Sequence, residues 1–259
     1  MGRLTTAFCH VRTQLLPLLC CALAAASSAG ASAAAPKTLS VYFPEAPPLS
    51  VSGPDGANGI VGDVAIKAVK LAGYVPKLIP LPWNRAQRTV QKGDDLLIIP
   101  LSRTPDREAE YTWIAPVMTM DRAFFSLDKR VASFEQARNT YARVAVGMGS
   151  AQEQKLREEG FSRDQIYPLK IGDNPAQLLL LGRVDAWFNG VPESRYIWPE
   201  VSSKPLLESP PLMTSDLYLA CSKHCDPTLV EALRKAVDGL RADGTIARIV
   251  SRYVDRPAH

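Results

Sequence analysis

The sequence predicts an α/β protein made of two lobes with a ligand cleft between them. Strand-like runs alternate with helix-like runs, which is typical of a mostly parallel sheet covered by helices. The alternation occurs twice with different residues, over about 37–127 (lobe 1) and 128–217 (lobe 2). A tail over 218–259 is too short to be a third domain, so we expect it to return to lobe 1. Two crossings between lobes, near Phe124–Leu127 and Asp216–Ala220, would then suit hinge closure around a ligand.

The first set of elements begins with Leu39–Phe43, where apolar and polar residues alternate as in a half-buried strand. Prolines after Phe43 end that strand. Apolar residues at helical spacing predict a helix over Val64–Ala72, which Gly73 ends. The set continues with a strand over Val75–Leu81, a helix from Pro82 to about Gly93 and a strand over Leu96–Ile99.

The second set repeats this order with other residues. A strand over Val144–Met148 leads to a helix over Ala151–Glu159, and Asn174-Pro175 has the residue types of a helix start. The remaining predicted elements are strands over Ile166–Ile171 and Val184–Phe188, a helix from Pro175 to Gly182, and, in the tail, a strand over Asp216–Ala220 and helices over Thr228–Ala242 and Thr245–Tyr253.

Residues 1–33 have the features of a cleaved secretory signal peptide. Arg3 and Arg12 provide a positive start, Leu15–Ala26 is apolar, and Ala31-Ser32-Ala33 is a small-residue cleavage site. A membrane anchor is the less favoured alternative, because the apolar run is shorter than the roughly 20 residues that a span needs. We therefore expect export to the periplasm.

The remaining chain has a modest charge and two cysteines. The net charge of +4 falls to about +2 without the two leader arginines, which does not indicate a nucleic-acid binder. Cys221 and Cys225 are the cysteines outside the leader, and an oxidising compartment favours a disulfide between them. A metal site using both cysteines and His224 is the alternative, but no other histidine of this region completes it.

A loop after the Leu96–Ile99 strand indicates what the protein binds. The run from Leu101 to Glu108 contains hydroxyl groups and two arginines, including Arg107. The planar guanidinium suits bidentate recognition of a carboxylate. A surface ion pair with Asp106 or Glu108 is the competing interpretation of Arg107.

Four motifs of the chain occur together in one known family. They are Leu101-Ser102-x-Thr104-x-x-Arg107, Gly149-Ser150, Gly182-Arg-Val-Asp-Ala186, and Ala242-Asp-Gly-Thr245 with a terminal Arg-Tyr253. In these motifs the chain resembles the bacterial extracellular solute-binding proteins of family 3, which serve ABC transporters for polar amino acids and related solutes. The resemblance covers essentially the whole chain after the leader and implies the two-lobed periplasmic-binding-protein fold (Venus flytrap, type II).

The resemblance implies roles for several residues. Arg107 matches the family arginine that binds the ligand α-carboxylate, Ser102 a contact beside it, and Ser150 a hydroxyl at a helix N-terminus. Trp83 and Arg85 stand where a pocket wall and a pocket charge would be useful. The alternatives are structural: Trp83 as a packing residue, Ser150 as a helix cap, and Arg85 as an exposed helical charge.

One departure from the family pattern concerns the ligand's amino group. Where amino-acid binders usually have an ammonium-binding Asp, this chain has Gly190, preceded by Asn189. Glu45 is the nearest plausible substitute, although a solvated loop acid is the favoured interpretation of it. The alternative is a ligand without an α-amino group.

We therefore predict a periplasmic protein that binds a small carboxylate for an inner-membrane ABC permease. We expect a monomer with no cofactor, no metal and no nucleic-acid partner. No catalytic set stands out, since His224 is the one histidine between the leader and the terminal His259. A dehydratase-like enzyme on the same fold and a ligand-presenting sensor component are the alternatives.

Overall fold

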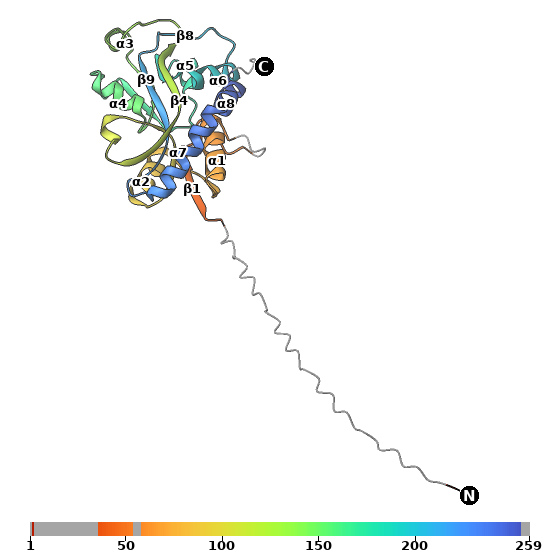
Figure 1. The fold of residues 1–259 in the computed structure, drawn as a ribbon. Coiled ribbons are helices and arrows are strands. Elements are labelled where there is room, and N and C mark those ends of the chain that lie inside the picture. Colours follow the sequence, from red (N-terminus) through yellow and green to blue (C-terminus); the bar gives the residue numbers. More distant parts are fainter. Residues whose placement is uncertain (1, 3–35, 54–57, 255–259) are drawn as a thin grey trace. The chain divides into compact units, whose positions relative to one another are not determined.

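The computed structural model describes residues 2, 36–53 and 58–254 (Figure 1). Apart from Gly2, the predicted signal peptide lies outside the described residues, so the structure does not test it. Within the described ranges, no helix has both the length and the apolar character needed to cross a membrane.

The first predicted elements form one end of the sheet. β1 (Thr38–Phe43) pairs in parallel with β2 (Val75–Pro80) and with β3 (Leu97–Ser102). The connecting helices are α1 (Ile60–Leu71) and α2 (Trp83–Lys92). These elements confirm the sequence-based order. The first helix starts at Ile60 rather than Val64, because its first turn is also buried in the core.

Two long antiparallel strands form the middle of the sheet. β4 (Tyr111–Ser126) pairs from Tyr111 to Arg122 with β9 (Met213–Ser222), and the two lie side by side in Figure 1. The strand order is β2-β1-β3-β9-β4-β7-β5-β6, with the short β8 (Leu207–Glu208) also paired to β4. β4 and β9 therefore join the first set of elements to the second.

The second set of elements forms the other end of the sheet. β5 (Val144–Gly147) pairs in parallel with β6 (Ile166–Leu169) and with β7 (Ala186–Gly190), and β7 pairs with β4. The accompanying helices are α3 (Phe134–Thr140), α4 (Ala151–Glu158), α5 (Pro175–Leu180) and α6 (Val191–Val201).

The elements β4, α6, α3 and β8 were not predicted from the sequence. In β4 the alternation of buried and exposed residues is broken by register shifts after Trp113 and after Pro116, so no period of two is visible in the sequence. Helix α6 contains Pro199 in its interior, a residue that usually argues against a helix because it removes a backbone donor.

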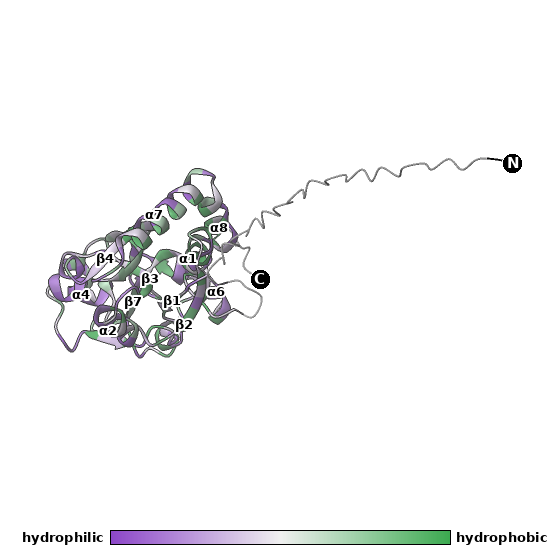
Figure 2. Ribbon diagram, turned by 60° about the horizontal axis from the view of Figure 1, so that its bottom comes forward, coloured by the Kyte–Doolittle hydropathy of each residue, from purple (hydrophilic) through white to green (hydrophobic). Residues whose placement is uncertain are grey.

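The tail packs on the first set of elements. α7 (Pro227–Ala242) contacts α1 and β4, and α8 (Thr245–Val254) contacts α1 and α7. Figure 2 shows α7 with mixed hydrophobic and hydrophilic colouring, as expected for an amphipathic helix. Four of its apolar residues at helical spacing are buried: Leu229, Leu233, Val237 and Leu240. The boundaries of the lobes stay a prediction.

The two ends of the sheet have separate apolar clusters. One cluster joins β1, β3 and α1 to α7 and α8. On the other side, Phe124 of β4 stacks on Phe188 of β7, with ring centroids 4.6 Å apart, and Phe134 packs edge-on against Phe188. Each set of elements thus has its own core, which is what a protein with two separately packed lobes requires.

Cys221 and Cys225 are bonded to each other in the structure. We expect neither cysteine of the protein purified without a reductant to react with an alkylating agent, because the two are bonded to each other. Mass spectrometry of the digested protein checks this. Because the closed loop is short, reduction should cost little stability, at the low end of about 0–5 kcal/mol. Two alkylated cysteines in the unreduced protein would contradict the prediction.

Candidate ligand-binding site

The end of β3 positions Ser102 and Arg107. The chain leaves β3 at Ser102 and makes a single 3₁₀ turn over Pro105–Arg107. This turn directs the guanidinium of Arg107 back to the strand end, where Nη1 donates to the Ser102 carbonyl at 3.2 Å. Arg107 is only 7% exposed, and this burial lowers the pKa of its guanidinium. The negative charge of the nearby Asp106 carboxylate acts in the opposite direction and raises that pKa. An arginine remains charged under these conditions, so the site holds a buried cation.

A second arginine, which the sequence analysis did not predict, lies beside the first. Arg122 of β4 is fully buried, and its Nη2 donates to the Ser102 hydroxyl at 2.8 Å. Its Nη1 donates to the Met120 carbonyl and to the Ser215 hydroxyl, while its Nε has no partner among the described residues. Burial lowers the pKa of Arg122 to about 10. Ser102 thus links two buried guanidiniums through its carbonyl and its hydroxyl.

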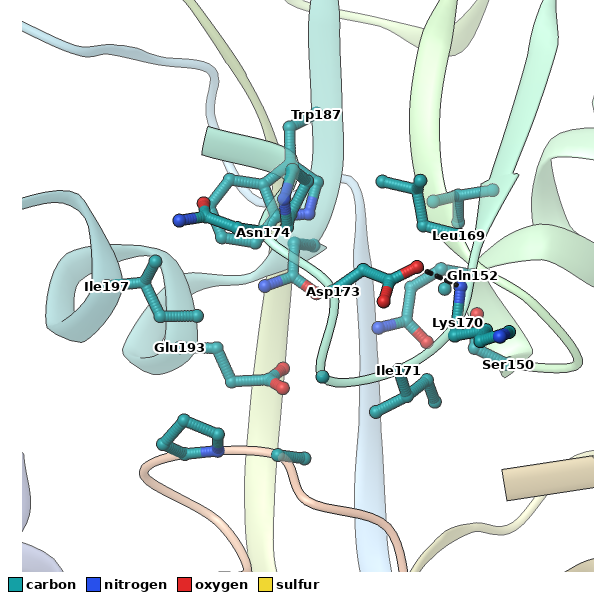
Figure 3. A pocket seen from close by; sticks show the side chains of 17 residues that line it. Ser150, Gln152, Leu169, Lys170, Ile171, Asp173, Asn174, Trp187, Glu193 and Ile197 are labelled. Atoms are coloured by element: carbon teal, nitrogen blue, oxygen red, sulfur yellow. Dashed lines mark hydrogen bonds between the residues drawn. The ribbon is translucent and has the colours of Figure 1, made fainter. Parts of the chain in front are cut away.

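Two adjoining cavities open beside these arginines. The smaller, of about 50 Å³, is lined by Arg107, Arg122 and Ser102. The larger, of about 260 Å³, is shown in Figure 3 and lies at the carboxyl ends of β5, β6 and β7. This edge of an α/β sheet is where ligands usually bind. The two cavities share a wall formed by Ala46, Ser150, Gln152, Ile171 and Glu193.

Ser150 lies in that shared wall and also caps α4. Its hydroxyl accepts the backbone N–H of Glu153 at 3.1 Å, and the Glu153 carboxylate accepts the N–H of Gly149 at 2.6 Å. The capping interpretation is therefore confirmed, and the same residue is 8% exposed at the edge of both cavities. A buried helix N-terminus favours an anion nearby.

The carbonyl of Gly149 connects the two sides of the site. It accepts from Nη2 of Arg107 at 2.9 Å, from Nε1 of Trp83 at 3.1 Å and from Nε2 of Gln87 at 3.2 Å. All three donors lie in the first set of elements, whereas Gly149 lies between β5 and α4. The first and second sets of elements are therefore in direct contact beside the cavities.

The other predicted site residues divide into two groups. Trp83 is buried and lines the smaller cavity, and Asn189 is buried and lines the larger one, where its amide donates to Ser194 Oγ at 3.3 Å. Arg85 is exposed, and Glu45 is exposed with its carboxylate bonded to the backbone N–H of Ser52. Neither of these two side chains lines either cavity.

An acid that the sequence analysis did not predict lies in the shared wall. Glu193 is in the first turn of α6, and Figure 3 shows its carboxylate directed into the larger cavity. Burial raises the pKa of this carboxyl to about 7, although the positive charge of Arg122 opposes the shift. The visible signal in the sequence was an acid three positions after the unexpected Gly190.

The raised pKa of Glu193 predicts a pH-dependent stability effect. An unfolded glutamate ionises near its ordinary value, whereas the folded one ionises near pH 7. The folded state therefore loses stability relative to the unfolded state as the pH rises from about 4.5 to about 7. We expect Glu193→Gln to raise the free energy of unfolding of the ligand-free protein by about 1–3 kcal/mol at pH 8, with no gain at pH 4. Urea denaturation at both pH values checks this, and a gain of equal size at both would contradict it.

Comparisons with known proteins agree with this architecture. The sequence matches the family model of bacterial extracellular solute-binding proteins, family 3, over residues 40–256. No curated protein matches the chain. The arginine-, lysine-, histidine-binding protein ArtJ from the thermophilic bacterium Geobacillus stearothermophilus is a similar solved structure. It has 14% identity and a TM-score of 0.75, and the match covers 85% of this chain and 96% of ArtJ.

Two ancestral proteins are also similar. One is an ancestral arginine-binding protein bound to glutamine, with 19% identity and a TM-score of 0.74. The match covers 86% of this chain and 100% of the ancestral protein. The amino acid-binding AncCDT-1, a precursor of cyclohexadienyl dehydratase, has 22% identity and a TM-score of 0.70 and covers 84% of this chain and 95% of its own. At these identities the likeness shows the fold alone. It confirms the predicted two-lobed α/β class.

Proposed function

Because the chain belongs to the bacterial extracellular solute-binding proteins of family 3, we propose that it captures a small carboxylate-containing solute, an amino acid or a similar compound, for an ABC importer. In this proposal the signal peptide directs the chain to the periplasm, where it acts as a monomer and delivers its ligand to an inner-membrane permease. Of the seven ligand contacts predicted from the sequence, the proposal keeps the five that line the cavities, Arg107, Ser102, Ser150, Trp83 and Asn189, and leaves out Arg85 and Glu45.

The observation that supports this most strongly is the pair of buried guanidiniums that meet at Ser102. Two buried cations next to a cavity require an anionic partner, because burying a charge without compensation is costly. The smaller cavity has room for a compact group such as a carboxylate, and the adjoining 260 Å³ holds the rest of a small solute. A ligand with a carboxylate at one end fits this division.

Native mass spectrometry of the protein purified from the periplasm tests the proposal. We expect a bound species of low mass that contains a carboxylate and is recovered unchanged after incubation. Titration calorimetry with the identified compound should then give one site per chain. A bound species that lacks a carboxylate, or one that binds equally well to protein without Arg107, would refute the proposed function.

A dehydratase-like activity is the second candidate, and Glu193 is the observation that favours it. A carboxyl group in a cavity with a pKa of about 7 has the proton affinity of a general acid or base at neutral pH. Recovery of the co-purified compound in a form that has lost water would support this enzyme activity. Recovery of the unchanged compound supports binding alone.

A further inference from the structure

The carboxylate of Glu193 is an unpaired charge site in the wall that both cavities share. Among the residues that the structure describes, it has no hydrogen-bond or ion-pair partner. Arg122 is near enough to favour the ionised carboxylate, but the two groups form no ion pair. A carboxylate facing a cavity in this way lacks a cation within contact distance.

Gly190 explains why this carboxylate lies where it does. A Cβ at position 190 would overlap Oε2 of Glu193 and would lie 2.7 Å from Sδ of Met120. Gly190 has φ −60° and ψ 132°, a conformation that any residue adopts, so the backbone does not require glycine there. Space is the reason: the Glu193 carboxylate occupies the volume that a side chain at position 190 would fill.

The charges around the cavities are arranged for a ligand with two opposite charges. Arg107 and Arg122 line the smaller cavity, whereas Glu193 lies between that cavity and the larger one. Asp173, the other acid of the larger cavity, is exposed and accepts the backbone N–H of Lys170. Glu193 is therefore the unpaired acid next to the arginines within the described part of the chain.

We propose that Glu193 holds a cationic nitrogen of the ligand whose carboxylate contacts Arg107, and that Gly190 is the residue that makes room for it. This inference rests on the proposed function and deepens it, because it specifies a zwitterionic ligand rather than a simple carboxylic acid. Glu193 then determines specificity in place of the Glu45 side chain, which is bonded to Ser52 outside the cavities.

Calorimetry with matched ligands tests the inference. The probes are the standard L-amino acids and the 2-hydroxy acids that correspond to alanine, leucine, phenylalanine and glutamate, which keep the carboxylate but lack the ammonium group. We expect at least one amino acid to bind the wild-type protein about 30-fold or more tightly than its hydroxy counterpart. Hydroxy acids that bind as tightly as the amino acids would overturn the inference and leave the proposed function standing. Failure of both sets to bind would overturn the inference, and the proposed function would then be decided by whether the co-purified ligand contains a carboxylate.

Variants of α6 and of Gly190 separate recognition from folding. Glu193→Gln should weaken binding of the preferred amino acid about 30-fold or more while leaving hydroxy acids unchanged. The matched control is Glu200→Gln, which makes the same change at an exposed position of the same helix and should have no effect. Unchanged amino-acid affinity in Glu193→Gln, with affinity lost in Arg107→Ala, would overturn this inference alone.

A double variant tests the spatial relation between positions 190 and 193. Gly190→Asp alone should weaken amino-acid binding, because the new side chain displaces the Glu193 carboxylate. Combined with Glu193→Ala, which removes one of the two overlaps and leaves the flexible Met120 side chain to shift, Gly190→Asp should restore affinity to within about tenfold of wild type, since an acid again occupies the same volume. A thermal melt of each variant confirms that it folds. If the folded double variant binds no better than Glu193→Ala, an acid at position 190 does not replace the one at position 193, and the proposed spatial relation is wrong.

Discussion

Arg107→Ala is expected to reduce affinity for the bound carboxylate by roughly 30-fold to several thousand-fold, or about 2–5 kcal/mol. The change removes a buried, charge-assisted donor and leaves the ligand's carboxylate desolvated without its partner. Arg107→Lys should recover only part of the loss, because an ammonium group does not reproduce the planar fork of donors. Calorimetry with the co-purified ligand measures both variants.

The control for this prediction is Arg88→Ala, which removes an arginine from an exposed position of α2. It should leave affinity within about twofold of wild type, because surface charges contribute little. Circular dichroism should show that Arg107→Ala remains folded. Equal affinity in the folded Arg107→Ala variant and in the wild type would mean that Arg107 is only a structural residue.

Gly149→Ala is expected to weaken ligand binding about tenfold or more, because it disturbs the contact between the two sides of the site. A Cβ at this position would overlap Oδ1 of Asn84 and would lie 2.9 Å from its Cγ. The Gly149 carbonyl accepts three side-chain donors from across the site, and hydrogen bonds of this kind, one of them charged, contribute about 1–3 kcal/mol. Calorimetry of the variant with the co-purified ligand measures the loss.

Gly182→Ala is the matched control for the effect of backbone conformation. Gly149 has φ +71° and Gly182 has φ +63°, so alanine is strained at both positions to a similar degree. A Cβ at Gly182 meets no atom within 4 Å, in contrast to Gly149. Both variants should lose thermal stability from the strained backbone, Gly149→Ala more than Gly182→Ala because of its overlap with Asn84, whereas only Gly149→Ala should lose affinity. Equal affinities in the two variants would show that the contact at Gly149 does not contribute to binding.

Local motifs explain why Ser102 and Arg107 could be assigned to one strand end from the sequence. Ser102 and Arg107 lie five residues apart on one strand end, so the turn that joins them brings both to the cavity without long-range information. Ser150 could be predicted for the same reason, since a helix cap depends on its immediate neighbours. These residues do line the cavities that the structure contains.

Arg122 and Glu193 could not be predicted, because their positions depend on pairing between distant segments. Arg122 reaches Ser102 only because β9 lies between β3 and β4 and brings its own Ser215 to the same guanidinium. Glu193 reaches the cavity only because Pro192 and its neighbours form a helix directly after β7. From the sequence alone, Gly190 indicated that the usual ammonium-binding Asp is missing, but it did not indicate that Glu193 lies next to the same place.

Glu45 and Arg85 illustrate the opposite limit. Both stand near motif residues in the sequence, yet their side chains point to solvent in the structure. Glu45 is bonded to Ser52 of its own loop, and Arg85 lies on the exposed face of α2, two residues from the buried Trp83. In a helix, two residues that are two positions apart point to roughly opposite faces, and the Glu45 side chain is held by its own loop, so proximity in sequence does not predict a shared site.

A crystal structure of the protein with its co-purified ligand tests the central claim most directly. We expect a carboxylate of the ligand within hydrogen-bond distance of the Arg107 guanidinium, with the rest of the molecule in the cavity beside Glu193. A ligand that places an uncharged group at Arg107, or that binds outside the cavities between β3 and the carboxyl ends of β5 to β7, would contradict it.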